Sequence, residues 1–304
     1  MTTDSLVVDV HHRTHTRYAA RVDVAHHLAH LSPLSDAAQQ VLAHALTIDP
    51  LPARRQMQHD VFGNLRTCFT IDAPHEEFVV DAHSRVVLTP AAAPSVSDYS
   101  PPWEEVAESM RYVSGRRFEP TSEFVFASPH VPLLPQARSY AAELFAPGRP
   151  WLDLVLDLMR VVHGDLQYEP GVTDVHTPLA AVFAERHGVC QDYAHLMIGV
   201  LRARGLPARY VSGYLLTRPA PGRPRLLGAD ASHAWVQAWS PSQGWLDLDP
   251  TNDLVPHLSH VRLAVGRDYS DVPPLRGVIR GGGEHRLKVA VSVIPEDEAD
   301  CQPA

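Results

Sequence analysis

The chain has 304 residues, of which 45% are hydrophobic and 20% are charged. This composition is ordinary for a globular protein, and the length suits two domains or one large one. The formal net charge is −9, from 26 basic and 35 acidic residues, which argues against a nucleic-acid partner. No run of about 18 uninterrupted apolar residues occurs, so we expect no membrane span and no membrane partner.

The cysteines and histidines indicate the cellular location to expect and whether to expect a metal site. Three cysteines, Cys68, Cys190 and Cys301, are too few and too scattered for a disulfide framework. The first ten residues lack the basic and apolar regions of a secretory signal, so we expect a reducing, cytoplasmic location. The 19 histidines form neither an HExxH nor a paired CxxC pattern. The sequence therefore predicts no metal site and no cofactor.

Residues 1–89 have the composition of short strands. Runs rich in β-formers are separated by turn signals, at 15–18, 67–71, 77–81 and 86–88. Two further segments, 24–30 and 37–46, could form short helices on composition. Because most runs are short and evenly punctuated, we predict a small β-sandwich domain over residues 1–89.

The rest of the chain changes from helical to strand-like periodicity. Residues 90–132 begin with a proline- and alanine-rich stretch, which we interpret as a linker and connecting segment. Helical segments follow, at 136–145, 150–162, 176–186 and 190–204. Strand-like runs come next, at 208–216, 233–239, 245–249, 260–265 and 287–293. This order predicts an α+β core over residues 133–295, with a flexible acidic tail at 296–304.

Cys190 opens the last predicted helix, directly after Gly188 and Val189. A thiol at a helix N-terminus lies at the positive end of the helix dipole, which favours the thiolate. The backbone N–H of the same residue can donate to a developing oxyanion. A free cysteine is more often a small buried apolar side chain, so a catalytic interpretation of Cys190 requires partners.

A hairpin in the predicted sheet can bring a histidine close to a carboxylate. Two strand-like runs are separated by residues 240–244, a length that suits a hairpin loop. We expect Trp239 to pair with Trp245. That register makes His233 the diagonal cross-strand neighbour of Asp249 on one face of the sheet.

A thiol, an imidazole and a carboxylate are the groups needed for acyl transfer through a thioester. The imidazole takes the thiol proton and later protonates the leaving amine, while the carboxylate fixes the imidazole tautomer. Asp247 has the same strand parity as Asp249 and is the alternative carboxylate. Because Asp249 precedes Pro250 at the end of the strand, we favour Cys190, His233 and Asp249 as the catalytic residues.

Several motifs in this order resemble the bacterial transglutaminase-like cysteine protease family. They cover most of the chain, at 15–18, 60–64, 188–196, 205–214, 232–235, 244–252, 266–274 and 281–283. The resemblance implies a papain-like α+β core preceded by a β domain, with Cys190 as nucleophile, His233 as base and Asp249 as orienting acid. It also implies an oxyanion donor upstream of the nucleophile. Tyr168 is a candidate, with an aromatic core residue as the alternative.

Other polar and aromatic residues of the motifs have simpler interpretations. Asp192 is expected to cap the helix, and His195, on another helix face than Cys190, is expected to be structural. Gln191 is either a cleft residue or a surface amide. Trp235 and the tryptophans that follow it are expected to form the wall that keeps the imidazole dry.

The sequence thus predicts a thiol-dependent acyl-transfer enzyme that cleaves a peptide, isopeptide or side-chain amide. Hydrolysis is favoured, because no second acceptor site is evident in the sequence. Protein-glutamine transamidation, with an amine acceptor, is the alternative enzyme activity. A non-catalytic scaffold that keeps the fold is the alternative of another class. The expected partner is a peptide or protein substrate, and a homo-oligomer is compatible with the sequence.

Overall fold

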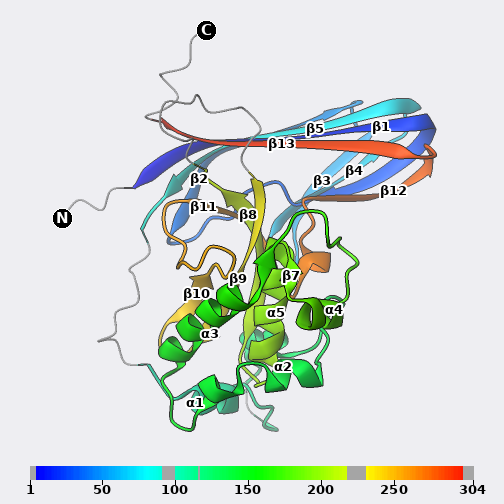
Figure 1. Cartoon of the computed structure of the whole chain (residues 1–304). Helices are drawn as coiled ribbons and strands as arrows, with labels where there is room; N and C mark the ends of the chain where they lie inside the picture. The colour runs from blue at the N-terminus through cyan, green and yellow to red at the C-terminus, as the bar shows by residue number, and fades with distance from the viewer. Residues whose placement is uncertain (1–4, 91–99, 116, 218–230, 297–304) are drawn as a thin grey trace, which may run out of the picture.

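The computed structural model describes residues 5–90, 100–115, 117–217 and 231–296. A β domain lies above a core of helices and strands (Figure 1). The β domain is one seven-stranded sheet. Its strands are β1 (Leu6–Ala29), β2 (Gln39–Asp49), β3 (Arg54–His59), β4 (Leu65–Ile71), β5 (His75–Leu88), β12 (Leu275–Gly281) and β13 (His285–Pro295).

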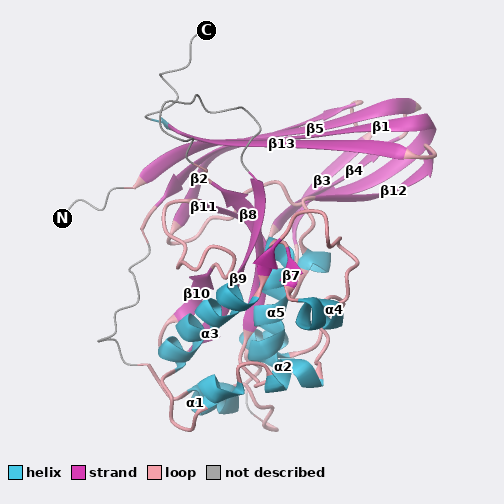
Figure 2. Cartoon of the chain, viewed as in Figure 1, coloured by secondary structure: helices cyan, strands magenta, loops and turns pink. Residues whose placement is uncertain are grey.

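β1 is 24 residues long and takes part in both layers of the β domain. Its first part pairs with β5 and β13, and its last part pairs with β4 and β12. Figure 2 shows the strands folded into two layers that join along β1. Apolar side chains from both layers fill the space between them, among them Val22, Phe69, Phe78 and Val80. The predicted β-sandwich is confirmed as a single folded sheet, but it is not limited to residues 1–89, because β12 and β13 belong to the same sheet.

Three local predictions for this domain need correction. Segments 24–30 and 37–46 form strands and not helices. The first lies in β1 and is hydrogen-bonded to β4 and β12, and the second lies in β2 and is hydrogen-bonded to β5. These hydrogen bonds outweigh the local helix propensity. The strand at 287–293, which we placed in the core, is part of β13 and pairs with β1. Residues 281–283, the last of the motifs, form the turn between β12 and β13. All three of its glycines have positive φ, which suits glycine.

The core packs helices against a four-stranded antiparallel sheet of order β10-β9-β8-β11. The strands are β8 (Ala208–Leu215), β9 (Ala231–Ser240), β10 (Gly244–Leu248) and β11 (His260–Gly266). The helices are α1 (Trp103–Ser109), α2 (Pro135–Ser139), α3 (Trp151–Asp165), α4 (Leu179–Glu185) and α5 (Cys190–Arg202). Short elements complete the core, namely η1 (Pro120–Val125), η2 (Ala142–Phe145), η3 (Tyr269–Asp271), β6 (Gln167–Tyr168) and β7 (His187–Gly188). The α+β prediction is confirmed.

Proline and backbone conformation explain where helix bounds differ from the predictions. The segment 136–145 is divided into α2 and η2, because Ala141 has a left-handed backbone with φ of 48°. α4 is shorter than 176–186 because Pro178 precedes its first residue. Helix α1 and η1 lie within the segment predicted as a linker. No helix in the described part of the chain is long and apolar enough to cross a membrane.

The β domain and the core share a hydrophobic cluster. Side chains of β1 and β13 pack against those of β8 and β11, among them Val10, Val293, Tyr214 and Leu263. A hydrogen bond of 2.8 Å joins the Tyr214 hydroxyl to His12 Nδ1 across the same interface. These contacts place the β domain beside the N-terminus of α5, where the candidate site lies.

Candidate active site

Cys190 is the first residue of α5, and Val189 caps the helix with an extended backbone. The Asp192 carboxylate accepts hydrogen bonds from the Val189 N–H at 2.8 Å and from the Thr173 hydroxyl at 2.7 Å. The capping role predicted for Asp192 is confirmed. A side chain at Gly188 would not fit, because its Cβ would lie 2.4 Å from Asp192 Oδ2. The sequence around Cys190 therefore fixes the direction of the first helical turn.

The hairpin between β9 and β10 has the predicted register. Trp239 pairs with Trp245, and Leu248 is the last paired residue of β10. Asp249 follows directly, and its Oδ2 lies 2.8 Å from His233 Nε2. The prediction that this hairpin brings the imidazole and the carboxylate together is confirmed.

Asp249 is fully buried and accepts five hydrogen bonds. Its Oδ2 contacts His233, His260 Nε2 at 2.9 Å and Asn252 Nδ2 at 2.7 Å. Its Oδ1 accepts from the backbone N–H groups of Thr251 and Asn252. Burial alone would raise the pKa of Asp249, but the hydrogen bonds from His233 and His260 outweigh it and hold that pKa well below its usual range. The carboxylate is therefore ionised at neutral pH.

His233 lies between this carboxylate and the thiol. Burial disfavours its charged form, but hydrogen bonds to Asp249 and Cys190 outweigh burial and raise the pKa of His233 to about 9. Because Nε2 faces Asp249, Nδ1 is the nitrogen left for Cys190. The ring lies over Trp235 with 6.0 Å between centroids. This arrangement favours an imidazolium at neutral pH.

Asp247, the alternative carboxylate, has other partners. It accepts a hydrogen bond from Trp235 Nε1 at 2.7 Å and one from Arg262 at 3.0 Å. Asp247 thus holds the tryptophan that supports His233, while Asp249 contacts His233 itself.

A cleft of about 370 Å³ contains Cys190, His233 and Gln191. Gln191 is therefore a cleft residue in position, as one of its two interpretations proposed. Tyr168 lies on β6, whose partner β7 leads into α5, and 53% of its surface is exposed. Partial burial and an electrostatic interaction with Cys190 raise the pKa of Tyr168. An aromatic core role for Tyr168 does not fit this exposure.

The tryptophans differ from their expected role. Trp235 is fully buried behind His233 and does not line the cleft, because its indole packs over Gly213. Trp239 and Trp245 line a different groove, where the Arg209 guanidinium lies 4.0 Å from the Trp245 ring centroid. Of these three tryptophans, only Trp235 packs against the imidazole of His233.

His195 has the structural role expected of it. Its side chain is buried and accepts a hydrogen bond from the Tyr269 N–H at 3.2 Å. Burial lowers the pKa of His195 to about 3, so the ring is neutral and suited to accept this bond.

His260 is the residue of the site that we did not predict. It begins β11, which lies on the far side of β8 from His233. Gly213 of β8 lies between them, and its missing side chain leaves room for the Trp235 ring, which contacts His260 at 5.0 Å between centroids. A glycine inside a strand can mark such a close approach, and this was the available signal.

Among the residues that the structure describes, two groups of side chains have ligand atoms close enough to share a metal ion. One is His233, Asp249 and His260, and the other is His11, Asp81 and His83 on the β domain. In the first group both imidazoles already contact the same carboxylate oxygen. We therefore interpret this group as a hydrogen-bonded network.

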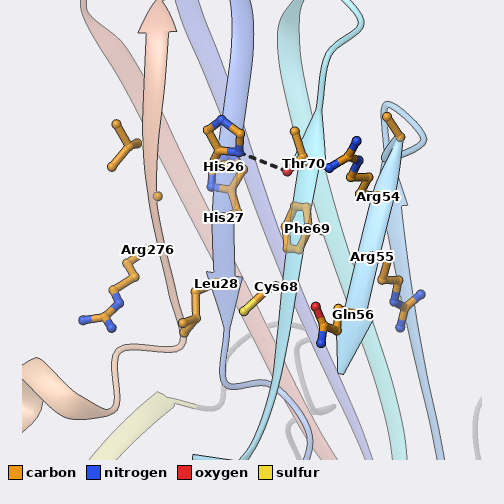
Figure 3. Close-up of a pocket in the computed structure, with 13 residues that line it drawn as sticks. His26, His27, Leu28, Arg54, Arg55, Gln56, Cys68, Phe69, Thr70 and Arg276 are labelled. Atoms are coloured by element: carbon orange, nitrogen blue, oxygen red, sulfur yellow. Dashed lines mark hydrogen bonds between the residues drawn. The ribbon is translucent and has the colours of Figure 1, made fainter. Parts of the chain in front are cut away.

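A hollow of about 950 Å³ lies on the β domain and contains Cys68 (Figure 3). His26 points toward Thr70 in this view and is hydrogen-bonded to its hydroxyl at 3.0 Å. Cys68 lies lower on the strand that carries Thr70, and its Sγ lies 3.7 Å from the side-chain amide of Gln58. The histidine here is paired with a hydroxyl, whereas His233 is paired with a buried carboxylate.

The fold and site define a class of proteins that carries a thiol, an imidazole and a carboxylate on a papain-like core behind a β domain. Residues 8–87 match the bacterial transglutaminase-like N-terminal region, and residues 138–250 match the transglutaminase-like superfamily. An uncharacterized protein of Mycobacterium tuberculosis is 38% identical over 294 residues, covering 94% of this chain and 92% of the relative. The chain belongs to the transglutaminase-like superfamily.

Two further comparisons concern named activities. The protein-glutamine gamma-glutamyltransferase of Pseudomonas aeruginosa is 39% identical over 126 residues, covering 40% of this chain and 19% of that protein. A crystal structure from Cytophaga hutchinsonii, described as a candidate cysteine protease, has a TM-score of 0.73 at 20% identity. The match covers 97% of this chain and 92% of the other, so the two folds are similar over most of both chains.

Proposed function

We propose that the protein is a thiol-dependent acyl-transfer enzyme with Cys190 as nucleophile, His233 as acid and base, and Asp249 as the orienting carboxylate. The observation that supports this most is the position of His233, which contacts an ionised buried carboxylate and the thiol at once. Its raised pKa makes an imidazolium available to pair with a thiolate and to protonate a leaving amine.

In the proposed mechanism, Cys190 Sγ attacks the carbonyl carbon of an amide. The backbone N–H of Cys190 and the hydroxyl of Tyr168 are the candidate donors to the oxyanion. His233 gives its proton to the leaving nitrogen as the C–N bond breaks, and a thioester remains. His233 then takes a proton from the attacking water or amine, and the acyl group leaves Cys190.

Hydrolysis is the favoured second step. A lysine-like acceptor is a cation before it reacts, and a carboxylate would help to hold it. The described lining of the cleft includes no aspartate or glutamate. The similarity to a named gamma-glutamyltransferase over part of the chain makes transamidation the second candidate.

A peptide-amide library incubated with a primary amine tests the proposal. We expect wild type to form an acyl-enzyme on Cys190 and to release mainly free acid, as detected by mass spectrometry. Cys190→Ala should form neither product, while Cys68→Ala should behave like wild type. Turnover by Cys190→Ala would overturn the proposal, and turnover that only a chelator stops would indicate metal-dependent hydrolysis. Amine adducts as the main product would favour transamidation.

A further inference from the structure

Strands of the β domain form one wall of the cleft that contains Cys190. Thr14 of β1 pairs with Val289 of β13, and both line the cleft together with Leu287. Leu275, the first residue of β12, lies in the same wall. Figure 1 shows β13 running above the core sheet that carries the candidate site. The β domain therefore contributes surface to the place where a substrate would lie.

This wall exposes apolar side chains. Leu287 is 58% exposed and Val289 is 49% exposed, although both are large and aliphatic. Leu275 is partly exposed beside them, and Pro274 extends the apolar surface. Apolar side chains gathered at a concave site are typical of ligand binding.

Apart from Cys190 and His233, the described lining of the cleft carries no ionised side chain. It includes no lysine, arginine, aspartate or glutamate, and its polar side chains include Gln191, Ser212 and Ser232. Burial lowers the pKa of His12, another lining residue, to about 4, so this imidazole is neutral at pH 7. A charged substrate side chain placed against Leu275, Leu287 and Val289 would lose water without gaining an opposite charge from this wall, which is unfavourable.

We propose that Leu287, Val289 and Leu275 form an apolar subsite that binds an uncharged aliphatic or aromatic side chain next to the scissile amide of a peptide. This inference rests on the proposed acyl-transfer function. The volume of the cleft, about 370 Å³, lies in the range of small-ligand sites and suits one such side chain and its flanking backbone. The β domain is then the part of the chain that selects the substrate.

A charge placed on the wall tests the subsite. Peptide amides with leucine, phenylalanine, glutamate or lysine next to the scissile bond are assayed with wild type and Leu287→Lys. We expect wild type to prefer leucine or phenylalanine. Leu287→Lys should lower kcat/KM for these peptides about tenfold or more, since hydrophobic pockets discriminate by roughly that factor, and it should improve the glutamate peptide relative to the lysine peptide.

Val278→Lys is the matched control. Val278 is an aliphatic residue that is 74% exposed on β12 and lines the separate hollow of Figure 3. We expect this variant to keep the wild-type order of substrates. Val278→Lys should also keep the wild-type rate of Cys190 alkylation by iodoacetamide, because Val278 lies outside the cleft that contains the thiol and His233.

The outcomes separate the subsite from the function. If Cys190→Ala is inactive but wild type prefers charged peptides, the subsite is wrong and the proposed function stands. The same holds if Leu287→Lys keeps the wild-type order of substrates. If Cys190→Ala turns over every peptide as wild type does, the proposed function itself is wrong.

Discussion

At the scale of single residues, the centre of the site is the carboxylate of Asp249. One of its oxygens receives hydrogen bonds from two imidazoles and an amide, from His233, His260 and Asn252. Several donors therefore stabilise the negative charge of this buried carboxylate, and charge-assisted hydrogen bonds are strong in a buried environment. His260 does not face the cleft that contains Cys190, so we regard it as a positioning residue that acts through Asp249.

Replacing His260 tests this role. His260→Phe removes one hydrogen bond to a charged group, which contributes about 1.5–3 kcal/mol, and we expect kcat/KM to fall about tenfold or more. With fewer donors on the carboxylate, His233 should also hold its proton more strongly, so the alkaline limb of the pH–rate profile should move to higher pH. His260→Gln, which keeps an N–H donor, should recover part of the activity. An unchanged pH profile in His260→Phe would contradict the role.

The pKa of His233 predicts a pH dependence of activity. Because that pKa is about 9, the ring keeps its proton at neutral pH and loses it as the pH rises. We expect kcat/KM to fall above about pH 9 as the imidazolium is lost. A profile that keeps rising through pH 10 would show that the protonated ring is not needed.

The same pKa predicts a pH dependence of stability. The folded pKa of about 9 lies above the ordinary histidine pKa of 6.5, so protonated His233 stabilises the fold fully below pH 6.5. That contribution should be lost between pH 6.5 and pH 9. Urea unfolding of wild type and His233→Gln at several pH values measures it, and the difference between the two proteins should shrink as the pH rises. A constant difference would contradict the raised pKa.

At the scale of elements, the N-terminus of α5 depends on close packing between Gly188 and Asp192. Gly188→Ala should displace the capping carboxylate, because its Cβ would lie 2.4 Å from Asp192 Oδ2. We expect the free energy of unfolding to fall by about 1–2 kcal/mol, the usual size of a lost cap. Gly164→Ala in α3, with no atom within 4 Å of its Cβ, should instead stabilise by about 0.5–1 kcal/mol. Equal effects in urea unfolding would contradict the packing argument.

The elements also show what the sequence could predict. The contact between His233 and Asp249 could be predicted from the sequence. It depends on a short hairpin loop, and the length of that loop sets the register of β9 and β10. The contact of His260 with Asp249 depends on β11 lying beside β8, far from the hairpin along the chain. The pairing of β12 and β13 with β1 joins residues 246 to 287 positions apart, and composition carries no information about such a partner. The function of the β domain as a cleft wall was hidden for the same reason.

At the scale of the whole molecule, the β domain and the core form one packed unit. Val293 of β13 is fully buried in the cluster that contains Tyr214 and Leu263. β13 follows the core in the sequence and pairs with β1, so the β domain is built from segments on both sides of the core. We therefore expect the two parts to unfold together.

Calorimetry tests this cooperativity. We expect one unfolding transition whose calorimetric and van't Hoff enthalpies agree. Val293→Ala should lower the free energy of unfolding by about 2 kcal/mol, in the range of buried aliphatic truncations, and should shift the whole transition. Two separate transitions, of which Val293→Ala shifts only one, would show that the two parts are independent.

The central claim is that Cys190, His233 and Asp249 act as one chemical unit. The most direct test is the rate at which iodoacetamide alkylates Cys190 at neutral pH, measured by mass spectrometry in wild type, His233→Ala and Asp249→Asn, with Cys68 as the internal reference. The account predicts that Cys190 reacts faster than Cys68 in wild type and loses at least tenfold in rate in both variants. Equal rates for Cys190 in all three proteins would contradict it.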